Sequence, residues 1–453
     1  MLALVASLAL LAAGAEPAAA VAMTGAGADA VAAAGAEPPR PAGRPVVSAA
    51  RRPAETERSL RACAFALPVC AHALAGVDPG AVLAALEDAA AAMRAYDAIG
   101  LPRPLPDGDL GGGPGFDLYL DPSVPPLAPR VGEDMRALGE RFDTASAFAR
   151  IGAGAGRGCA GASDAAYALG YAVAARLDAG AGEGALAMTA SYLATLAAPC
   201  PAAELAAIDA FQRAPERAIT GGAPGPLDGA LLFPWYLDDA YGVGRPAAVV
   251  LGLLSIGAQR TPADALRFRD EPDLFDALRG SLRLRGSKLD DLLLDFAVAR
   301  AFAGSRSDGA HLSDAARLGD FGRVRFEWSL PFSTLPRRVA PLRPIEPTGA
   351  TYLWLDLASI QGAAEVTFVA DWELPAVFRW ALVKVDRGGA EVGRVDVAGI
   401  FGATRAQRTV VGLDGLAGIL VVGVNAGSLD RSSPFDPDET PMMPHAYTVW
   451  LEK

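Results

Sequence analysis

The segment SDAAYALGYAVAARL, from Ser163 to Leu177, carries a pair of residues whose spacing bears directly on chemistry. It is rich in Ala and lacks Pro, which predicts one continuous helix. Tyr167 and Tyr171 are four residues apart and therefore lie on the same face of that helix. Phenols bind metals as phenolates, and with a pKa of about 10 they stay protonated unless a strong metal is present. We favour the alternative, in which the two rings pack against neighbouring elements.

The scarcity of histidine limits the available chemistry further. The 453 residues include three His, at positions 72, 311 and 445, far apart in the sequence. A triad or a three-His metal site would need these distant segments to converge, and no G-x-S-x-G motif is present. The net charge of −12 argues against a nucleic-acid partner, because binding phosphates requires clustered Lys and Arg.

Two weaker site patterns remain open. The Gly-rich run GAGAGRG at 152–158 follows a predicted strand, but it matches neither the dinucleotide-binding nor the Walker A motif, so we interpret it as a turn. Two short acidic loops offer oxygen ligands for calcium, although solvated turns are the simpler expectation in an acidic chain. The loops contain Asp107 and Asp109, and Asp436, Asp438 and Glu439.

Residues 1–22 look like a secretory signal peptide. Their apolar run ends at Glu16, too early to span a bilayer, and the small residues Ala18-Ala19-Ala20 fit a cleavage site. The first basic residue is Arg40, so a charged n-region is missing, which a mis-assigned start codon would explain. We expect a secreted, periplasmic or cell-envelope protein whose mature chain has no transmembrane segment.

Export favours disulfides between the four cysteines, for which three pairings exist. Seven residues of continuous helix would hold Cys63 and Cys70 about 10 Å apart, but Pro68 should break such a helix, so we pair them. We also pair Cys159 with Cys200, which precede and follow two helices joined by the short link AGAGEG. Such helices should pack antiparallel and bring the two cysteines together. Free buried thiols are the alternative.

The element pattern divides the chain into a helical and a β-rich part. Residues 23–58 have the composition of a disordered linker. FDLYL (116–120) and ASAFARI (145–151) predict strands. Helices are predicted at 79–98, 164–178, 186–197, 202–213, 228–241, 246–257, 272–280 and 287–303. Eight β-rich segments at 323–329, 351–357, 365–371, 377–385, 391–399, 408–413, 418–425 and 446–453, with a hairpin turn DRGG at 386–389, predict a β-sandwich.

The helix pair resembles that of the secreted bacterial zinc metallopeptidases of the gluzincin type. In that family one helix reads His-Glu-x-x-His-Ala, and the next supplies a Glu ligand within a motif such as Glu-Gly-x-Ala-x-Tyr. The two His and this Glu bind zinc, and the Glu after the first His activates water. Here the first helix reads Tyr167-Ala168-Leu169-Gly170-Tyr171-Ala172, so both His positions are Tyr and the base position is Ala.

The second helix, EGALAMTASYLATL, fits the family motif in two registers. In the register we prefer, Tyr192 and Ala190 match and the ligand Glu is replaced by Ala187. In the other, Glu183 and Gly184 match and Met188 replaces the Tyr. The resemblance covers residues 79 to 453, because PLPDGDLGGGPGFDLYL is similar to the family's Gly-rich turn and strand, LLFPWYLDDAYG to its downstream helix, and a C-terminal β-sandwich is common there.

The resemblance implies an α+β fold: a mainly helical gluzincin-like domain at 59–310 with a small N-terminal strand region, a connecting segment at 311–345, and a β-sandwich at 346–453. Because positions 167, 168, 171 and 187 carry no ligand or base, we expect no enzyme activity, metal or cofactor. The chain would be an inactive homologue that binds a peptide or protein. Two alternatives are a structural or cell-envelope interaction protein acting through its sandwich, and a hydrolase with unrecognised catalytic residues.

Overall fold

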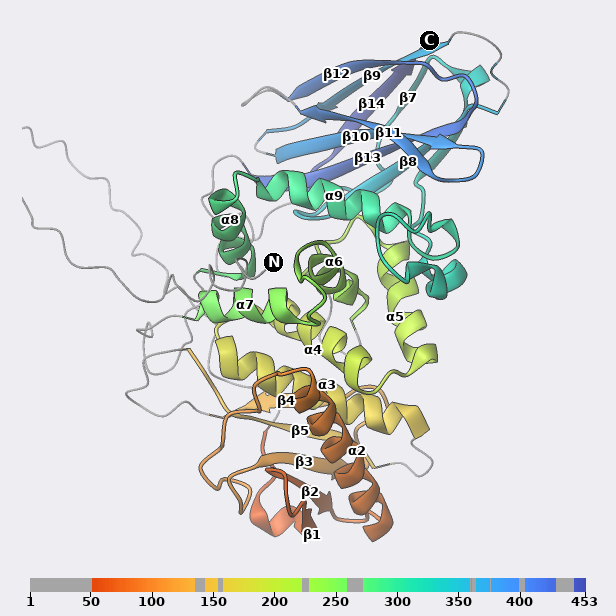
Figure 1. The fold of residues 1–453 in the computed structure, drawn as a ribbon. Helices are drawn as coiled ribbons and strands as arrows, with labels where there is room; N and C mark the ends of the chain where they lie inside the picture. Colours follow the sequence, from red (N-terminus) through yellow and green to blue (C-terminus); the bar gives the residue numbers. More distant parts are fainter. Residues whose placement is uncertain are drawn as a thin grey trace, which may run out of the picture. The chain divides into compact units, whose positions relative to one another are not determined.

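The computed structural model is an α+β fold (Figure 1). It describes residues 51–134, 143–153, 158–221, 228–258, 272–358, 360, 364–374, 376–398, 404–428 and 444–453. The predicted signal peptide, most of the predicted linker, part of the GAGAGRG run and the acidic loop with Asp436, Asp438 and Glu439 lie outside these residues. Within the described residues, no helix has both the length and the apolar character needed to cross a membrane.

The first sheet has the order β1–β2–β3–β5–β4. Its strands are β1 (Arg58–Cys63), β2 (Val69–Leu74), β3 (Phe116–Asp121), β4 (Arg130–Glu133) and β5 (Ala147–Gly152). The central strands β2, β3 and β5 are parallel, and both edge strands are antiparallel to their neighbours. The predicted strands at 116–120 and 145–151 are confirmed, whereas β1, β2 and β4 were not predicted.

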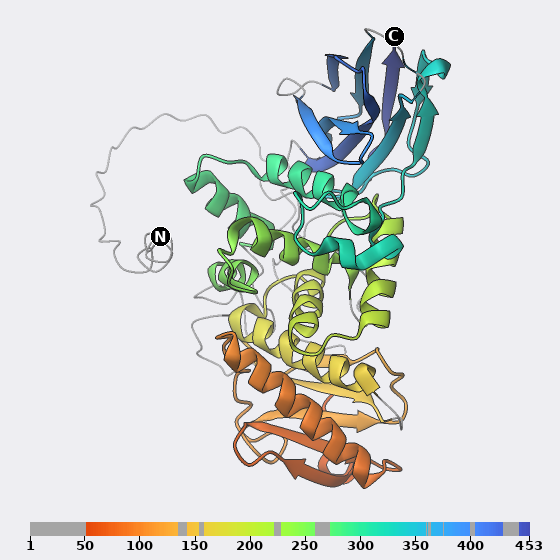
Figure 2. The same ribbon diagram turned by 45° about the vertical axis from the view of Figure 1, so that its right-hand side comes forward.

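The two faces of this sheet differ in polarity because side chains alternate along each strand. Apolar residues such as Ala71, Leu118 and Ala149 face α2 (Pro79–Ala98) and α3 (Gly158–Asp178). Figure 2 shows these two helices side by side against the sheet. The alternate positions on the opposite face are polar or aromatic: His72, Asp117, Tyr119, Asp121, Phe148 and Arg150.

The predicted linker is too long at its C-terminal end. Residues Glu55–Glu57 form a short 3₁₀ helix (η2), and β1 begins at Arg58. The Arg52 side chain is only 13% exposed and pairs with carboxylates on the first sheet and in the loop before β3. Composition suggested disorder here because Arg and Pro are typical of linkers, but Arg52 pairs with buried carboxylates.

Each predicted helical segment contains an observed helix. After α2 and α3 come α4 (Glu183–Ala197), α5 (Pro201–Arg213), η3 (Gly229–Leu231), α6 (Leu232–Tyr241), α7 (Ala248–Gly257), α8 (Leu274–Leu284), α9 (Leu289–Ala301), η4 (Gly304–Arg306) and η5 (Ala315–Gly322). Helices α3 and α4 pack closely at Gly170, where a Cβ would lie 3.0 Å from the Leu193 Cβ.

Both predicted disulfides, Cys63–Cys70 and Cys159–Cys200, are confirmed.

The C-terminal region forms two facing sheets with the orders β11–β10–β13–β8–β6 and β12–β9–β14–β7. Their strands are β6 (Trp328–Pro331), β7 (Arg337–Val339), β8 (Ala350–Asp356), β9 (Glu365–Trp372), β10 (Ala376–Asp386), β11 (Glu391–Ala398), β12 (Arg405–Val411), β13 (Leu416–Ser428) and β14 (Tyr447–Glu452), with η6 (Phe332–Thr334) between β6 and β7. Aromatic residues including Phe368, Phe378 and Trp380 fill the space between the sheets. The hairpin at 386–389 is confirmed, since the Gly389 N–H donates to the Asp386 carbonyl.

The boundary drawn between the helical part and the sandwich does not match the packing. Strands β6 and β7 fall in the predicted connecting segment, yet both pair into the sandwich. The outer face of β8, β10 and β13 belongs to the same apolar core as the helices, with Tyr352, Val383 and Leu420 among its members. Helix α9 covers this face, and the Tyr352 hydroxyl donates to the Ala297 carbonyl at 2.9 Å. The helices and the sandwich therefore share one core.

Candidate functional site

The positions that correspond to the zinc motif are buried. On α3, Tyr167, Ala168 and Tyr171 have exposed fractions of 5%, 0% and 8%. The Tyr171 hydroxyl donates to Oε1 of Glu133, on the edge strand β4, at 2.9 Å. Burial raises the pKa of Tyr167 far above its ordinary value, and the neighbouring carboxylates Asp228 and Glu183 raise it further. Tyr167 is therefore a neutral phenol at physiological pH.

The corresponding positions on α4 are also occupied by packing contacts. Ala187 is buried, and its carbonyl accepts a hydrogen bond from the Ser191 hydroxyl at 2.8 Å. Glu183, the carboxylate of the second register, is exposed in the first turn of α4. The Tyr192 hydroxyl donates to Oδ2 of Asp238 on α6 at 2.8 Å. The tyrosines at 171 and 192 thus tie the helix pair to other elements.

These residues do not fit the zinc site that the resemblance implies. Catalytic zinc needs three protein ligands with an open position for water, and a nearby base to take a proton from that water. Positions 167 and 171 offer neutral or hydrogen-bonded phenols, and the Ala168 methyl cannot accept a proton. Among the residues that the structure describes, no three His, Cys, Asp or Glu side chains are grouped so that they could hold a metal ion.

The three histidines lie in separate parts of the fold. His72 is on β2, with its Nε2 2.8 Å from Oδ1 of Asp117. His311 follows α9, with Nδ1 2.9 Å from Oδ1 of Asp308 and Nε2 2.7 Å from Oε2 of Glu391. His445 precedes β14 and forms an isolated backbone bridge with Ile345.

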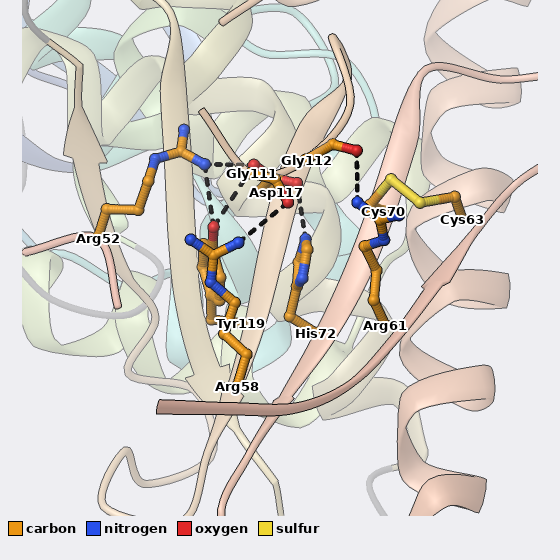
Figure 3. The surroundings of a disulfide bond; sticks show 10 residues. All are labelled: Arg52, Arg58, Arg61, Cys63, Cys70, His72, Gly111, Gly112, Asp117 and Tyr119. Carbon is orange, nitrogen blue, oxygen red and sulfur yellow. Dashed lines mark hydrogen bonds and ion pairs between the residues drawn. A yellow bond between two sulfur atoms is a disulfide. The ribbon is translucent and has the colours of Figure 1, made fainter. Parts of the chain in front are cut away.

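A cluster of charged and aromatic side chains covers the polar face of the first sheet (Figure 3). At its centre, Arg52 donates Nε to Oδ1 of Asp134 at 3.1 Å and Nη2 to Oδ2 of the same carboxylate at 2.7 Å. Arg52 also pairs with Asp117 and, at 2.9 Å, with Asp107. We call Arg52, His72, Asp107, Asp117, Tyr119 and Asp134 the Arg52 cluster.

Aromatic rings pack against the charged side chains of the Arg52 cluster. His72 stacks on Tyr119 with the ring centroids 4.7 Å apart, and the Tyr119 ring meets Phe148 edge to face. The Arg52 guanidinium lies 4.8 Å from the centroid of the Phe148 ring, and Arg58 lies 5.6 Å from that of Tyr119. These cation–π contacts add to the ion pairs in holding residues 52–58 against the sheet.

Burial and neighbouring charge shift the pKa values of two carboxylates of the Arg52 cluster in opposite directions. Burial raises the pKa of Asp107 to about 6, although Arg52 opposes the shift. Burial also disfavours ionised Asp117, but the hydrogen bond with His72 and the charge of Arg52 outweigh it and lower the pKa of Asp117. The His72 and Asp117 side chains are each only 1% exposed, so this pair lies in the packed interior of the cluster.

A cavity of about 480 Å³ opens beside the Arg52 cluster. Leu74 and Ala75 reach it from the end of β2, Asp121, Pro122 and Ser123 from the end of β3, and Arg150 from β5. The segment before β1 closes it with Arg51, Arg52, Pro53 and Glu57. Open sheets commonly bind ligands at the carboxyl ends of their parallel strands, and this cavity lies at those ends.

Most of this site was not predicted from the sequence. Arg52 was assigned to a linker, and Asp107 and Asp109 were considered as a calcium loop. Asp107 instead pairs with Arg52 and accepts the Asp109 backbone N–H at 3.0 Å. A signal was present in FDLYLD, where Asp117, Tyr119 and Asp121 alternate with apolar residues and thereby mark a polar sheet face.

No protein-family model matches the chain, and no curated protein matches it. The solved structures with some likeness include the pre-peptidase C-terminal domain of a collagenase from Bacillus anthracis, 6% identical, with a TM-score of 0.20, covering 28% of this chain and 97% of that domain. Another is the Yersinia pseudotuberculosis-derived mitogen, 11% identical, with a TM-score of 0.18 and coverages of 26% and 86%. A third is Aeromonas hydrophila PliG, a periplasmic inhibitor of g-type lysozyme, 14% identical, with a TM-score of 0.17 and coverages of 28% and 100%. Likenesses this low carry no argument about function.

Proposed function

We propose that the chain is an extracytoplasmic binding protein, built on a degenerate gluzincin-type helix pair, that binds a peptide or protein and does not hydrolyse it. The observation that carries the proposal is that both positions of the motif's His residues hold buried tyrosines, and that the Tyr171 hydroxyl donates a hydrogen bond to Glu133. Ala168 at the position of the base supports the same conclusion. The two disulfides support a location outside the cytoplasm, where such bonds persist.

Metal analysis and peptidase assays on the purified, oxidised full-length chain test this proposal. We expect far less than one zinc ion per chain, no cleavage of casein or synthetic peptides, and the same Tm with and without a chelator. Close to one zinc per chain together with chelator-sensitive proteolysis would refute the proposal. Proteolysis that resists chelators would instead favour a hydrolase with other catalytic residues.

A further inference from the structure

The arginines that line the cavity differ in how far their donors are used. Arg52 donates to, or pairs with, three carboxylates and the Tyr119 hydroxyl. Arg150 directs Nε and Nη2 to Oδ2 of Asp121. Arg51 is exposed and contacts no acceptor within the described part of the chain. Among the described residues, the Arg51 guanidinium has no hydrogen-bond acceptor. The Arg150 guanidinium is held by Asp121, but its Nη1 has no acceptor among the same residues.

The carboxylates that line the cavity also differ. Asp121 is occupied, because Oδ1 accepts the backbone N–H and the hydroxyl of Ser123 at 2.8 and 2.7 Å while Oδ2 accepts from Arg150. Glu57 accepts the Ala54 N–H through Oε2 at 2.7 Å, and its Oε1 has no partner among the residues that the structure describes. Within the described part of the chain, the cavity thus presents unpaired groups of both signs, donors at Arg51 and Arg150 and an acceptor at Glu57.

We propose that this cavity binds the C-terminal carboxylate of a short peptide. This inference rests on the proposed binding function and names the ligand class. Guanidinium groups match the planar geometry of a carboxylate, and Arg150, already fixed by Asp121, loses little freedom on binding. A volume of about 480 Å³ suits a ligand of this size. Glu57 and Asp121 disfavour a phosphate dianion, whereas Glu57 can accept from a peptide N–H or ammonium group.

Isothermal titration of the oxidised full-length chain tests the inference. The probes are Ala-Ala-Ala with a free C-terminus, the same peptide with a C-terminal amide, and inorganic phosphate. We expect the peptide with a free carboxylate to bind at least about ten-fold more tightly than the amidated peptide or phosphate. The amide cannot form charge-assisted hydrogen bonds with the arginines. Phosphate can form them, but as a dianion it is repelled more strongly by Glu57. Arg51→Gln should weaken binding of the free peptide by at least about ten-fold.

The matched control is Arg94→Gln, an exposed arginine on α2, which packs against the other face of the sheet. It should leave binding unchanged, and both variants should keep the wild-type Tm because both side chains are exposed. Equal affinity for the free and amidated peptides, unaltered binding by Arg51→Gln, phosphate binding as tight as that of the peptide, or no heat at millimolar peptide would each overturn the inference. Equal binding of both peptides would leave the proposed binding function intact, and hydrolysis in the separate assay would overturn that function alone.

Discussion

At the scale of single residues, the Arg52 cluster combines one arginine with three buried or nearly buried aspartates. Their separations along the chain reach 82 residues, between Arg52 and Asp134. Local patterns cannot reveal such a pairing, because neither residue type nor spacing near Arg52 indicates partners so far away. The burial of Tyr167 and Tyr171 was predictable, since Ala-rich helices that lack Pro bury their aromatic residues when another helix packs against them.

Replacing Arg52 should be strongly destabilising. Arg52→Met leaves Asp107, Asp117 and Asp134 without their shared cation, which we expect to cost about 3–5 kcal/mol of unfolding free energy. Urea denaturation at neutral pH measures this loss. Arg58→Met is the matched control, because Arg58 donates to the Pro53 and Gly111 carbonyls and pairs with no carboxylate among the described residues. An equal loss in both variants would contradict the importance of the ion pairs.

The Tyr171 hydroxyl and ring should contribute separately to stability. Tyr171→Phe removes the hydrogen bond to Glu133 and keeps the ring, so we expect a loss of about 1 kcal/mol. Tyr171→Ala also leaves a cavity between α3 and β4, which should cost about 3–5 kcal/mol. Thermal or urea unfolding of both variants checks the difference. Similar losses would show that the ring does not fill the position as the structure indicates.

At the scale of elements, helices were far easier to predict than the strands of the first sheet. The helical segments show Gly and Pro breaks and a continuous apolar pattern. Strand β2 reads VCAHAL, and its Ala content favours a helix on intrinsic propensity. It is a strand in the structure because it pairs with β1 on one side and β3 on the other, and its small side chains let α2 pack on it. The predicted disulfide joins β1 and β2, where Cys63 and Cys70 lie directly opposite each other, although neither strand was predicted.

His311 lies in the loop between η4 and η5 and links that loop to β11 in a pH-dependent manner. Both ring nitrogens contact carboxylates, and ionised carboxylates only accept, so both contacts are satisfied when the ring is protonated. Burial lowers the pKa of His311, but the hydrogen bonds with Glu391 and Asp308 outweigh it and raise the pKa overall. The stabilisation is therefore fully present below the ordinary His pKa of about 6.5 and is lost as the pH rises through the raised value.

We expect His311→Gln to lose more unfolding free energy relative to the wild type at about pH 5.5 than at about pH 9. Urea denaturation of both proteins at the two pH values measures the change. A difference that is constant with pH, or larger at high pH, would contradict the protonated bridge.

The two disulfides should contribute unequally. The chain-entropy relation assigns about 4 kcal/mol to the Cys159–Cys200 bond, which closes a separation of 41 residues, and about 2.5 kcal/mol to Cys63–Cys70, with a separation of 7. We expect the double variant Cys159→Ala/Cys200→Ala to be less stable than Cys63→Ala/Cys70→Ala. Non-reducing peptide mapping should first establish the pairing in the wild type. Crossed cysteine pairs, or the reverse order of stability, would refute this expectation.

At the scale of the whole molecule, the sandwich depends on the helices that cover it. The sheet that contains β8, β10 and β13 is apolar on both faces, one toward β9, β12 and β14 and the other toward α9. The sequence predicted the sandwich because its strands are short and separated by turns. It could not predict the shared core, because a strand buried on both faces loses the polar alternation that would distinguish inner from outer positions.

Expressed alone, residues 346–453 should not form a stable monomer. That fragment lacks β6 and β7 and exposes Tyr352, Val383 and Leu420, which the helices cover in the whole chain. Size-exclusion chromatography and thermal unfolding should show aggregation or no cooperative transition. A monomeric fragment with a sharp transition would show that the sandwich is an independent domain.

The position of Arg52 also has a consequence for the order of events during synthesis. The ribosome releases this residue before any of its acidic partners, and the last of them, Asp134, follows 82 residues later. The Cys63–Cys70 hairpin can close after only seven residues, whereas the helix pair needs the 41 residues from Cys159 to Cys200. The segment around Arg52 is thus among the last parts bound to the first sheet, because Arg52 must wait for acidic partners that are synthesised later.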